Sequence, residues 1–109
     1  MMCYTSNISY RGDKPVLNVT VKSGDKTFAP TWAMVMGGKK GTVTDEGYIK
    51  RYYAMMRESY RKKRGRWEEI LNMKEMVLVC YCIGHIACHR TILKDIFVKC
   101  GAVDGGGLR

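Results

Sequence analysis

One apolar run, MVLVCY at residues 76–81, constrains the fold of this 109-residue chain more than any other feature. A strand that is apolar on both faces is typical of a central strand in a sheet covered on both sides. The run stands between a helical pattern that ends near Met73 and another that begins at Thr91. Strands that alternate with helices in this way indicate an α/β fold.

Two further segments resemble strands, MCYTS at 2–6 and VLNVTV at 16–21. The clearest helix follows Thr44, an N-cap type of residue, and tyrosines and methionines recur at helical spacing up to Tyr60. We expect this stripe to lie mostly in the core. Shorter helices are predicted at 31–36, 66–73 and 91–99, and 101–109 is either a short edge segment or a loose tail. The chain is thus predicted to be a single α/β domain over 1–109, with a short, mainly parallel sheet flanked by helices.

Composition limits the location and the partners of the chain. No apolar run reaches the roughly 18 residues of a membrane span, and MMCYTSNISY at the start lacks the features of a signal peptide. Five cysteines, without the spacing of a disulfide framework, fit a reducing compartment. We therefore expect a cytoplasmic protein that does not contact membranes. A formal net charge of +9 favours anionic partners.

Much of the positive charge lies in YRKKRGRW, residues 60–67. Cations at a helix end suit the negative end of the helix dipole, and charge runs usually face water. The alternative is a patch that contacts phosphates and gives weak nucleic-acid binding. We favour the first interpretation and keep the second open.

A third feature is the clustering of reactive side chains in LVCYCIGHIACHRTILKDIF, residues 78–97. A strand ends near Cys82 and a loop with Gly84 and His85 follows, after which a helix is opened by Cys88, His89, Arg90 and Thr91. Ligands of open α/β sheets bind at the carboxyl ends of strands, and helix N-termini offer free N–H groups to anions. A guanidinium matches a phosphate, and glycine lets the backbone approach a ligand. The segment therefore predicts an anion-binding cradle, although it lacks the GK[ST] ending of a Walker loop.

Zinc is a second interpretation of the same residues, with Cys80, Cys82, Cys88 and the two histidines as donors. Structural zinc sites favour cysteine pairs separated by two to four residues, and adjacent Cys88 and His89 chelate poorly. We therefore expect no metal and no cofactor.

Thiol chemistry is a third interpretation. A cysteine near a helix N-terminus has a lowered pKa, which suits Cys88, and Cys82 lies at the strand end. A phosphatase-type loop needs arginine six residues after cysteine, but Cys88 follows Cys82 at that distance and Lys94 follows Cys88. Cys82, Cys88 and His85 thus stay candidates for catalysis without a complete motif. Cys3, Cys80 and Cys100 are expected to be inert.

The motifs LVCYC, glycine and ACHR, together with the early YTS at 4–6, resemble the signature of domain-of-unknown-function family 488. FAPTW and the tyrosine-rich helix look like its phage-type members. The resemblance covers most of the chain, and it implies a compact α/β fold with the YTS strand beside the CHR strand. It would bring Thr5, Ser6, Cys88, His89 and Arg90 around one cleft. Ala87 stands where phenylalanine is usual, and His85 adds an imidazole.

We expect the cradle to bind a phosphorylated small molecule, with a nucleotide favoured. His85, Tyr10 or Phe28 would contact the base, and the cradle residues would hold the phosphate. A phage-encoded chain would then sequester a host immune nucleotide signal of the ADP-ribose or cyclic nucleotide type. One alternative is an enzyme that hydrolyses or transfers a nucleotide or phosphoester, and another is a nucleic-acid-binding protein. The oligomeric state is open, and a homodimer with a site between subunits is one arrangement.

Overall fold

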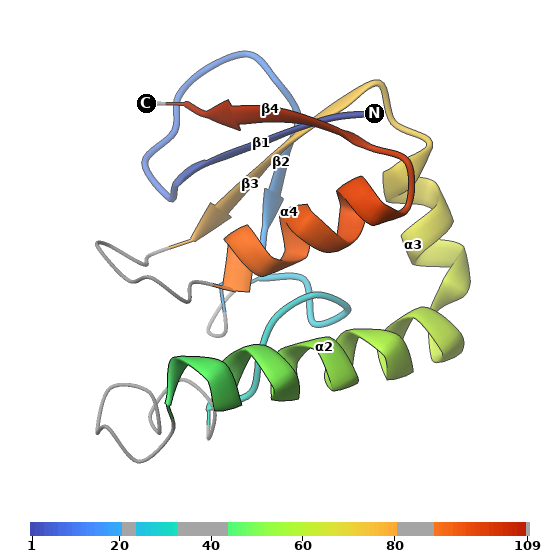
Figure 1. Cartoon of the computed structure of the whole chain (residues 1–109). Helices are drawn as coiled ribbons and strands as arrows, with labels where there is room; N and C mark the ends of the chain where they lie inside the picture. Colours follow the sequence, from blue (N-terminus) through green and yellow to red (C-terminus); the bar gives the residue numbers. More distant parts are fainter. Residues whose placement is uncertain (21–23, 33–43, 81–88, 109) are drawn as a thin grey trace.

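The computed structural model describes residues 1–20, 24–32, 44–80 and 89–108. Within these ranges four parallel strands form one sheet in the order β2-β3-β1-β4. The strands are β1 (Met2–Asn7), β2 (Val16–Asn18), β3 (Glu75–Cys80) and β4 (Val103–Gly107). The same ranges contain three helices, α2 (Asp45–Lys62), α3 (Arg64–Leu71) and α4 (His89–Lys99). The predicted α/β class is confirmed (Figure 1).

Strand β3 occupies an interior position in the sheet, as its apolar sequence predicts. Residues 76–80 are all buried, with exposed fractions of 0 to 3%. Successive side chains of a strand point to opposite faces, and Met76, Leu78 and Cys80 belong to the main core cluster. Val77 and Val79, which alternate with them, are buried on the other face. Both faces of β3 are therefore covered.

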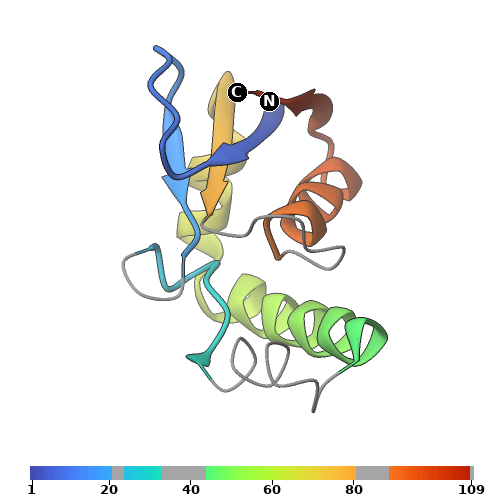
Figure 2. The same ribbon diagram turned by 90° about the vertical axis from the view of Figure 1, so that its left-hand side faces the viewer.

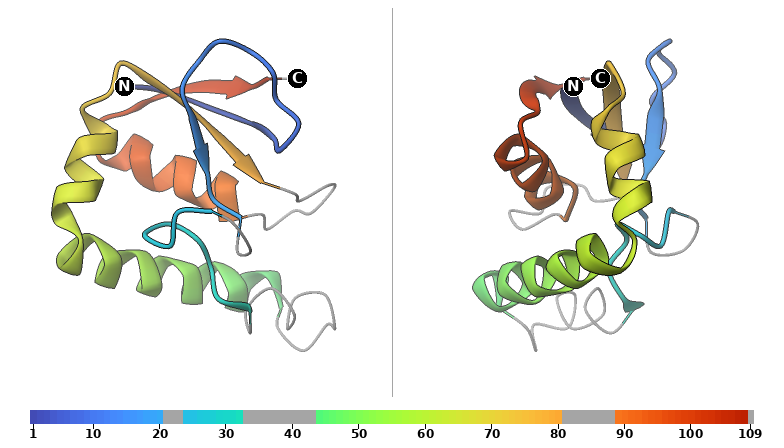
Figure 3. Two further views of the ribbon diagram at one scale, coloured as in Figure 1. Left: turned by 180° about the vertical axis from the view of Figure 1, so that it is seen from behind. Right: turned by 90° about the vertical axis from the view of Figure 1, so that its right-hand side faces the viewer.

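The helices all contribute to one core. Helix α4 packs against β1, β3 and β4, and α2 packs against α4 (Figures 1 and 2). Helix α3 follows α2 and leads back towards the start of β3 (Figure 3). The α2 stripe is divided: Tyr48, Tyr52 and Met56 are buried, whereas Tyr53 and Tyr60 are half-buried.

Aromatic rings fill the centre of this core. The ring centroid of Phe28 lies 4.9 Å from that of Trp67 and 5.7 Å from that of Phe97, each in an edge-on arrangement. Phe28 itself is fully buried. The described residues 24–32 between β2 and α2 are thereby fixed into the core, although they form no strand.

The last residues form an edge strand rather than a loose tail. The N–H groups of Val103 and Leu108 donate to the carbonyls of Met1 and Thr5, at 2.8 and 2.7 Å. A Cβ atom on Gly105 would come within 2.5 Å of the Tyr4 ring, so glycine permits this close approach. Gly101, with φ of +107°, allows the turn between α4 and β4.

Several boundaries differ from the predictions. Strand β2 ends at Asn18, α3 begins at Arg64 and ends at Leu71, and α4 begins two residues earlier than expected. The predicted helix at 31–36 lies mostly outside the described residues, as does the end of the run at 76–81. No helix in the described ranges has the length and apolar character that a membrane crossing requires.

Candidate functional site

The carboxyl ends of the two interior strands lie side by side. Asn7 of β1 and Cys80 of β3 are the last residues paired in parallel register, and the Ile8 N–H donates to the Cys80 carbonyl at 3.1 Å. The first turn of α4 begins close to this edge (Figure 1). This is the edge at which ligands of open α/β sheets bind.

Arg90 connects the first turn of α4 to the end of β1. Its side chain is half-buried, and its Nη1 donates a hydrogen bond to the Ser6 carbonyl. Ser6 is buried, and its hydroxyl donates to the Leu108 carbonyl at 2.7 Å. The ends of β1 and β4 and the start of α4 are thus joined, as the expected pairing of the YTS strand with the CHR segment requires.

His89 lies below this edge, in the core. It is 3% exposed, and its Nε2 is 2.5 Å from the Val19 carbonyl oxygen. Because a carbonyl only accepts, Nε2 carries the proton, and Nδ1 can accept from the Tyr48 hydroxyl at 3.5 Å. The Cys80 sulfur is 3.5 Å from Nε2. His89 is therefore a buried residue that fixes the start of α4, and it does not line the surface of the site.

Of the other predicted ligand-binding residues, three lie near the carboxyl edge of the sheet and one lies in the core. Thr5 is half-buried in β1 and Thr91 is exposed on the first turn of α4. Tyr10 is half-buried just after β1, and its N–H donates to the Asn7 carbonyl at 3.1 Å. These three lie on the segments that meet at the carboxyl edge. Phe28 does not, because its ring is packed in the core, where it has no face open to a nucleotide base.

The middle of the motif falls outside the described ranges. Cys82, Gly84, His85 and Cys88 all lie within residues 81–88. Their proposed roles as nucleophile, proton donor or backbone cradle stay predictions. Among the described residues, no three His, Cys, Asp or Glu side chains are grouped as a metal site would require.

Two contributors to this region were missed in the sequence. The Val19 carbonyl holds His89 over a separation of 70 residues, and a backbone acceptor leaves no sequence signal. Tyr48 was expected in the core from its helical spacing, and this spacing could not identify His89 as its neighbour.

One family model matches residues 10–101, and its family is DUF488-N3a, described as the active DUF488-N3 subclade. Comparison with curated proteins and with solved structures gives no significant match.

Proposed function

Because the chain belongs to the DUF488-N3a family, and the match covers the strand-loop-helix segment, we propose that this segment forms its ligand site. The ligand is a phosphorylated small molecule, with a nucleotide as the leading candidate. The phosphate binds at the carboxyl edge of β1 and β3, next to the first turn of α4. For a phage-encoded chain, the role is sequestration of a host immune nucleotide signal.

The charge at the start of α4 carries this proposal. Helix N-termini favour acidic side chains, as α2 illustrates with Glu46 in its first turn. Helix α4 has no acidic residue in its first turn and has the cation Arg90 there instead. A guanidinium beside the positive end of a helix dipole is unfavourable by itself. An anion at this position would interact favourably with both.

The position of Arg90 supports the same conclusion. The hydrogen bond to the Ser6 carbonyl restrains a side chain that would otherwise lose rotamer freedom on binding. The planar guanidinium matches the oxygen spacing of a phosphate. The net charge of +9 adds long-range attraction for an anionic ligand.

A nucleotide fits this edge better than inorganic phosphate does. Tyr10 follows β1 directly and is half-buried, so a flat base could pack against its ring. Tyr10 therefore takes the role in base contact that Phe28 cannot take.

The enzyme alternative has one specific observation in its favour, because the matched subclade is described as active. In that case Cys82 or Cys88 is the nucleophile, His85 is the general acid or base, and Arg90 holds the phosphate. Both functions place the phosphate at the same position. A binding protein releases its ligand unchanged, whereas an enzyme releases a product.

The test is mass spectrometry of small molecules that the purified protein retains from a nucleotide-rich lysate and releases on denaturation. Wild type and Arg51→Ala, whose exposed cation lies on α2, should each retain a nucleotide. Arg90→Ala should lower retention at least about tenfold, and Arg90→Lys should fall between, because lysine keeps the charge without the planar fork.

Full retention by folded Arg90→Ala and Arg90→Lys variants would contradict the site assignment. Circular dichroism establishes that each variant is folded. Recovery of a chemically altered ligand would favour an enzyme over a binding protein. The Cys82→Ser and Cys88→Ser variants would then be tested separately.

A further inference from the structure

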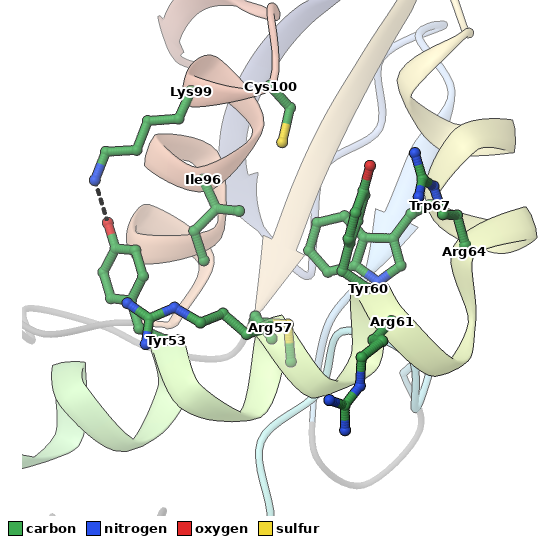
Figure 4. A pocket seen from close by; sticks show the side chains of 10 residues that line it. Tyr53, Arg57, Tyr60, Arg61, Arg64, Trp67, Ile96, Lys99 and Cys100 are labelled. Atoms are coloured by element: carbon green, nitrogen blue, oxygen red, sulfur yellow. Dashed lines mark hydrogen bonds between the residues drawn. The ribbon is translucent and has the colours of Figure 1, made fainter.

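A cavity lies at the opposite end of α4, away from the site proposed above. Its volume is about 580 Å³, and it is lined by α2, α3 and the last turns of α4 (Figure 4). Met56, Trp67 and Ile96 give it an apolar lining. Its size is in the range of cavities that bind small organic groups.

Cations line this cavity without any carboxylate among its lining residues. They are Arg57, Arg61, Arg64 and Lys99. Arg61 is paired with Glu58 at 2.7 Å, and Arg64 is paired with Glu68 at 3.2 Å. Within the described part of the chain, Arg57 and Lys99 have no carboxylate partner. The cavity is therefore a region of positive potential that attracts anions.

The helix dipole explains only part of this charge. Arg61 lies in the last turn of α2 and Lys99 in the last turn of α4, where cations are stabilised. Arg57 lies within α2, more than a turn from its end, and it projects towards the cavity in Figure 4. An anionic ligand would give Arg57 the partner that it lacks among the described residues.

Two half-buried tyrosines stand on either side of Arg57. Tyr53 and Tyr60 are seven residues apart on α2, which corresponds to about 10 Å along the helix axis. Lys99 lies 5.0 Å from the ring centroid of Tyr53, and Arg64 lies 5.0 Å from that of Tyr60. Each ring already holds a cation at one face, so aromatic and cationic surfaces alternate along the cavity (Figure 4).

We propose that this cavity binds single-stranded nucleic acid, with one base inserted between Tyr53 and Tyr60 and the flanking phosphates on the arginines. Aromatic side chains within a basic groove are the usual means of binding single strands. Arg57 and Arg61 are about 6 Å apart along α2, and Arg64 lies beyond the break between the two helices, at the start of α3. The three guanidinium groups therefore belong to two helices and offer contacts to more than one phosphate. A strand is therefore favoured over a free mononucleotide. A paired base in a duplex could not enter the cavity.

Fluorescence anisotropy with a labelled oligothymidylate of about 12 nucleotides tests this proposal. Arg57→Glu and Arg51→Glu change the net charge equally, and both residues are exposed on α2, but Arg51 does not line the cavity. Arg57→Glu should weaken binding at least about tenfold and Arg51→Glu less than about threefold. Arg57→Ala should lower the slope of log affinity against log salt by about one.

Tyr53→Leu removes a ring with little change in charge and should weaken binding about fivefold or more. The Arg90→Ala variant should bind the oligonucleotide as wild type does. The experiment can therefore contradict the proposal for this cavity without contradicting the proposal for the carboxyl-edge site, and the reverse. Equal weakening by Arg57→Glu and Arg51→Glu, in variants with unchanged thermal melting, would reduce the effect to net charge and overturn the proposal. Displacement of the probe by adenosine monophosphate at equal nucleotide concentration would overturn the assignment to a strand.

Discussion

At the scale of single residues, Tyr52 is the most informative buried polar group. Its hydroxyl donates to the Phe28 carbonyl at 2.5 Å, and both residues are fully buried. Tyr52→Phe would leave this carbonyl without its donor, which costs about 1–3 kcal/mol of unfolding free energy. Tyr53→Phe, one residue along and half-buried, should change it by less than about 0.5 kcal/mol. Urea denaturation measures the free energy of unfolding of both variants. A loss for Tyr52→Phe as small as that expected for Tyr53→Phe would show that the Phe28 contact is unimportant.

The described cysteines should differ sharply in reactivity. Burial raises the pKa of the Cys3 thiol to about 11, so very little thiolate is present at pH 8. Cys100, which the sequence predicts to be inert, is instead exposed at the end of α4. When the thiols are titrated with a disulfide reagent at pH 8, the Cys100→Ser variant should show one fast-reacting thiol fewer than wild type. The Cys3→Ala variant should show the same number as wild type. A fast thiol lost in Cys3→Ala would contradict the burial of β1.

At the scale of elements, the start of α2 depends on its cap. The Thr44 side chain accepts a hydrogen bond from the Gly47 N–H at 3.0 Å, as its position in the sequence predicts. Thr44→Ala should cost about 1 kcal/mol of stability, and Thr44→Ser close to zero, because serine keeps the acceptor. Thermal melting followed by circular dichroism would measure this, and similar melting temperatures for the two variants would exclude a capping role.

The elements with strong local patterns were predicted well. The apolar run gave β3, and the helical stripe after Thr44 gave α2. Strand β2 was predicted to reach residue 21 but ends at Asn18, where the side-chain and main-chain carbonyl oxygens accept N–H groups of Thr20 and Asp25. Such local hydrogen bonds compete with the strand ladder, and β-branched composition cannot reveal them.

The candidate site was predictable in outline only. The family resemblance brought Ser6 and Arg90 together across 84 residues, and the hydrogen bond between them is present. Phe28 was misplaced because a segment between Gly24 and Pro30 suggests an exposed loop. Instead, the Asp25 carboxylate accepts the Thr27 N–H at 2.9 Å, and the chain folds so that Phe28 enters the core.

At the scale of the whole molecule, β4 protects the interior of the sheet. It pairs with β1 along one edge, and Asp104 forms an ion pair with Lys94 of α4 at 3.2 Å. Deleting residues 103–109 would leave β1, which carries the buried side chain of Cys3, as an open edge of the sheet. We expect a loss of more than about 2 kcal/mol and concentration-dependent association, because open edges pair with other chains. Light scattering and urea denaturation would detect these changes, and a monomer of wild-type stability would contradict the role of β4.

The order β2-β3-β1-β4 also determines when the protein can fold. Every described strand pair is parallel, so no hairpin can form early, and β1 must wait for partners at residues 75–80 and 103–107. During synthesis β1 therefore stays without its partner strands until residues 75–80 and 103–107 have followed. Sheets made only from distant pairings fold slowly. The interval between the translation of β1 and its burial therefore adds to the exposure of this chain to chaperones and proteases.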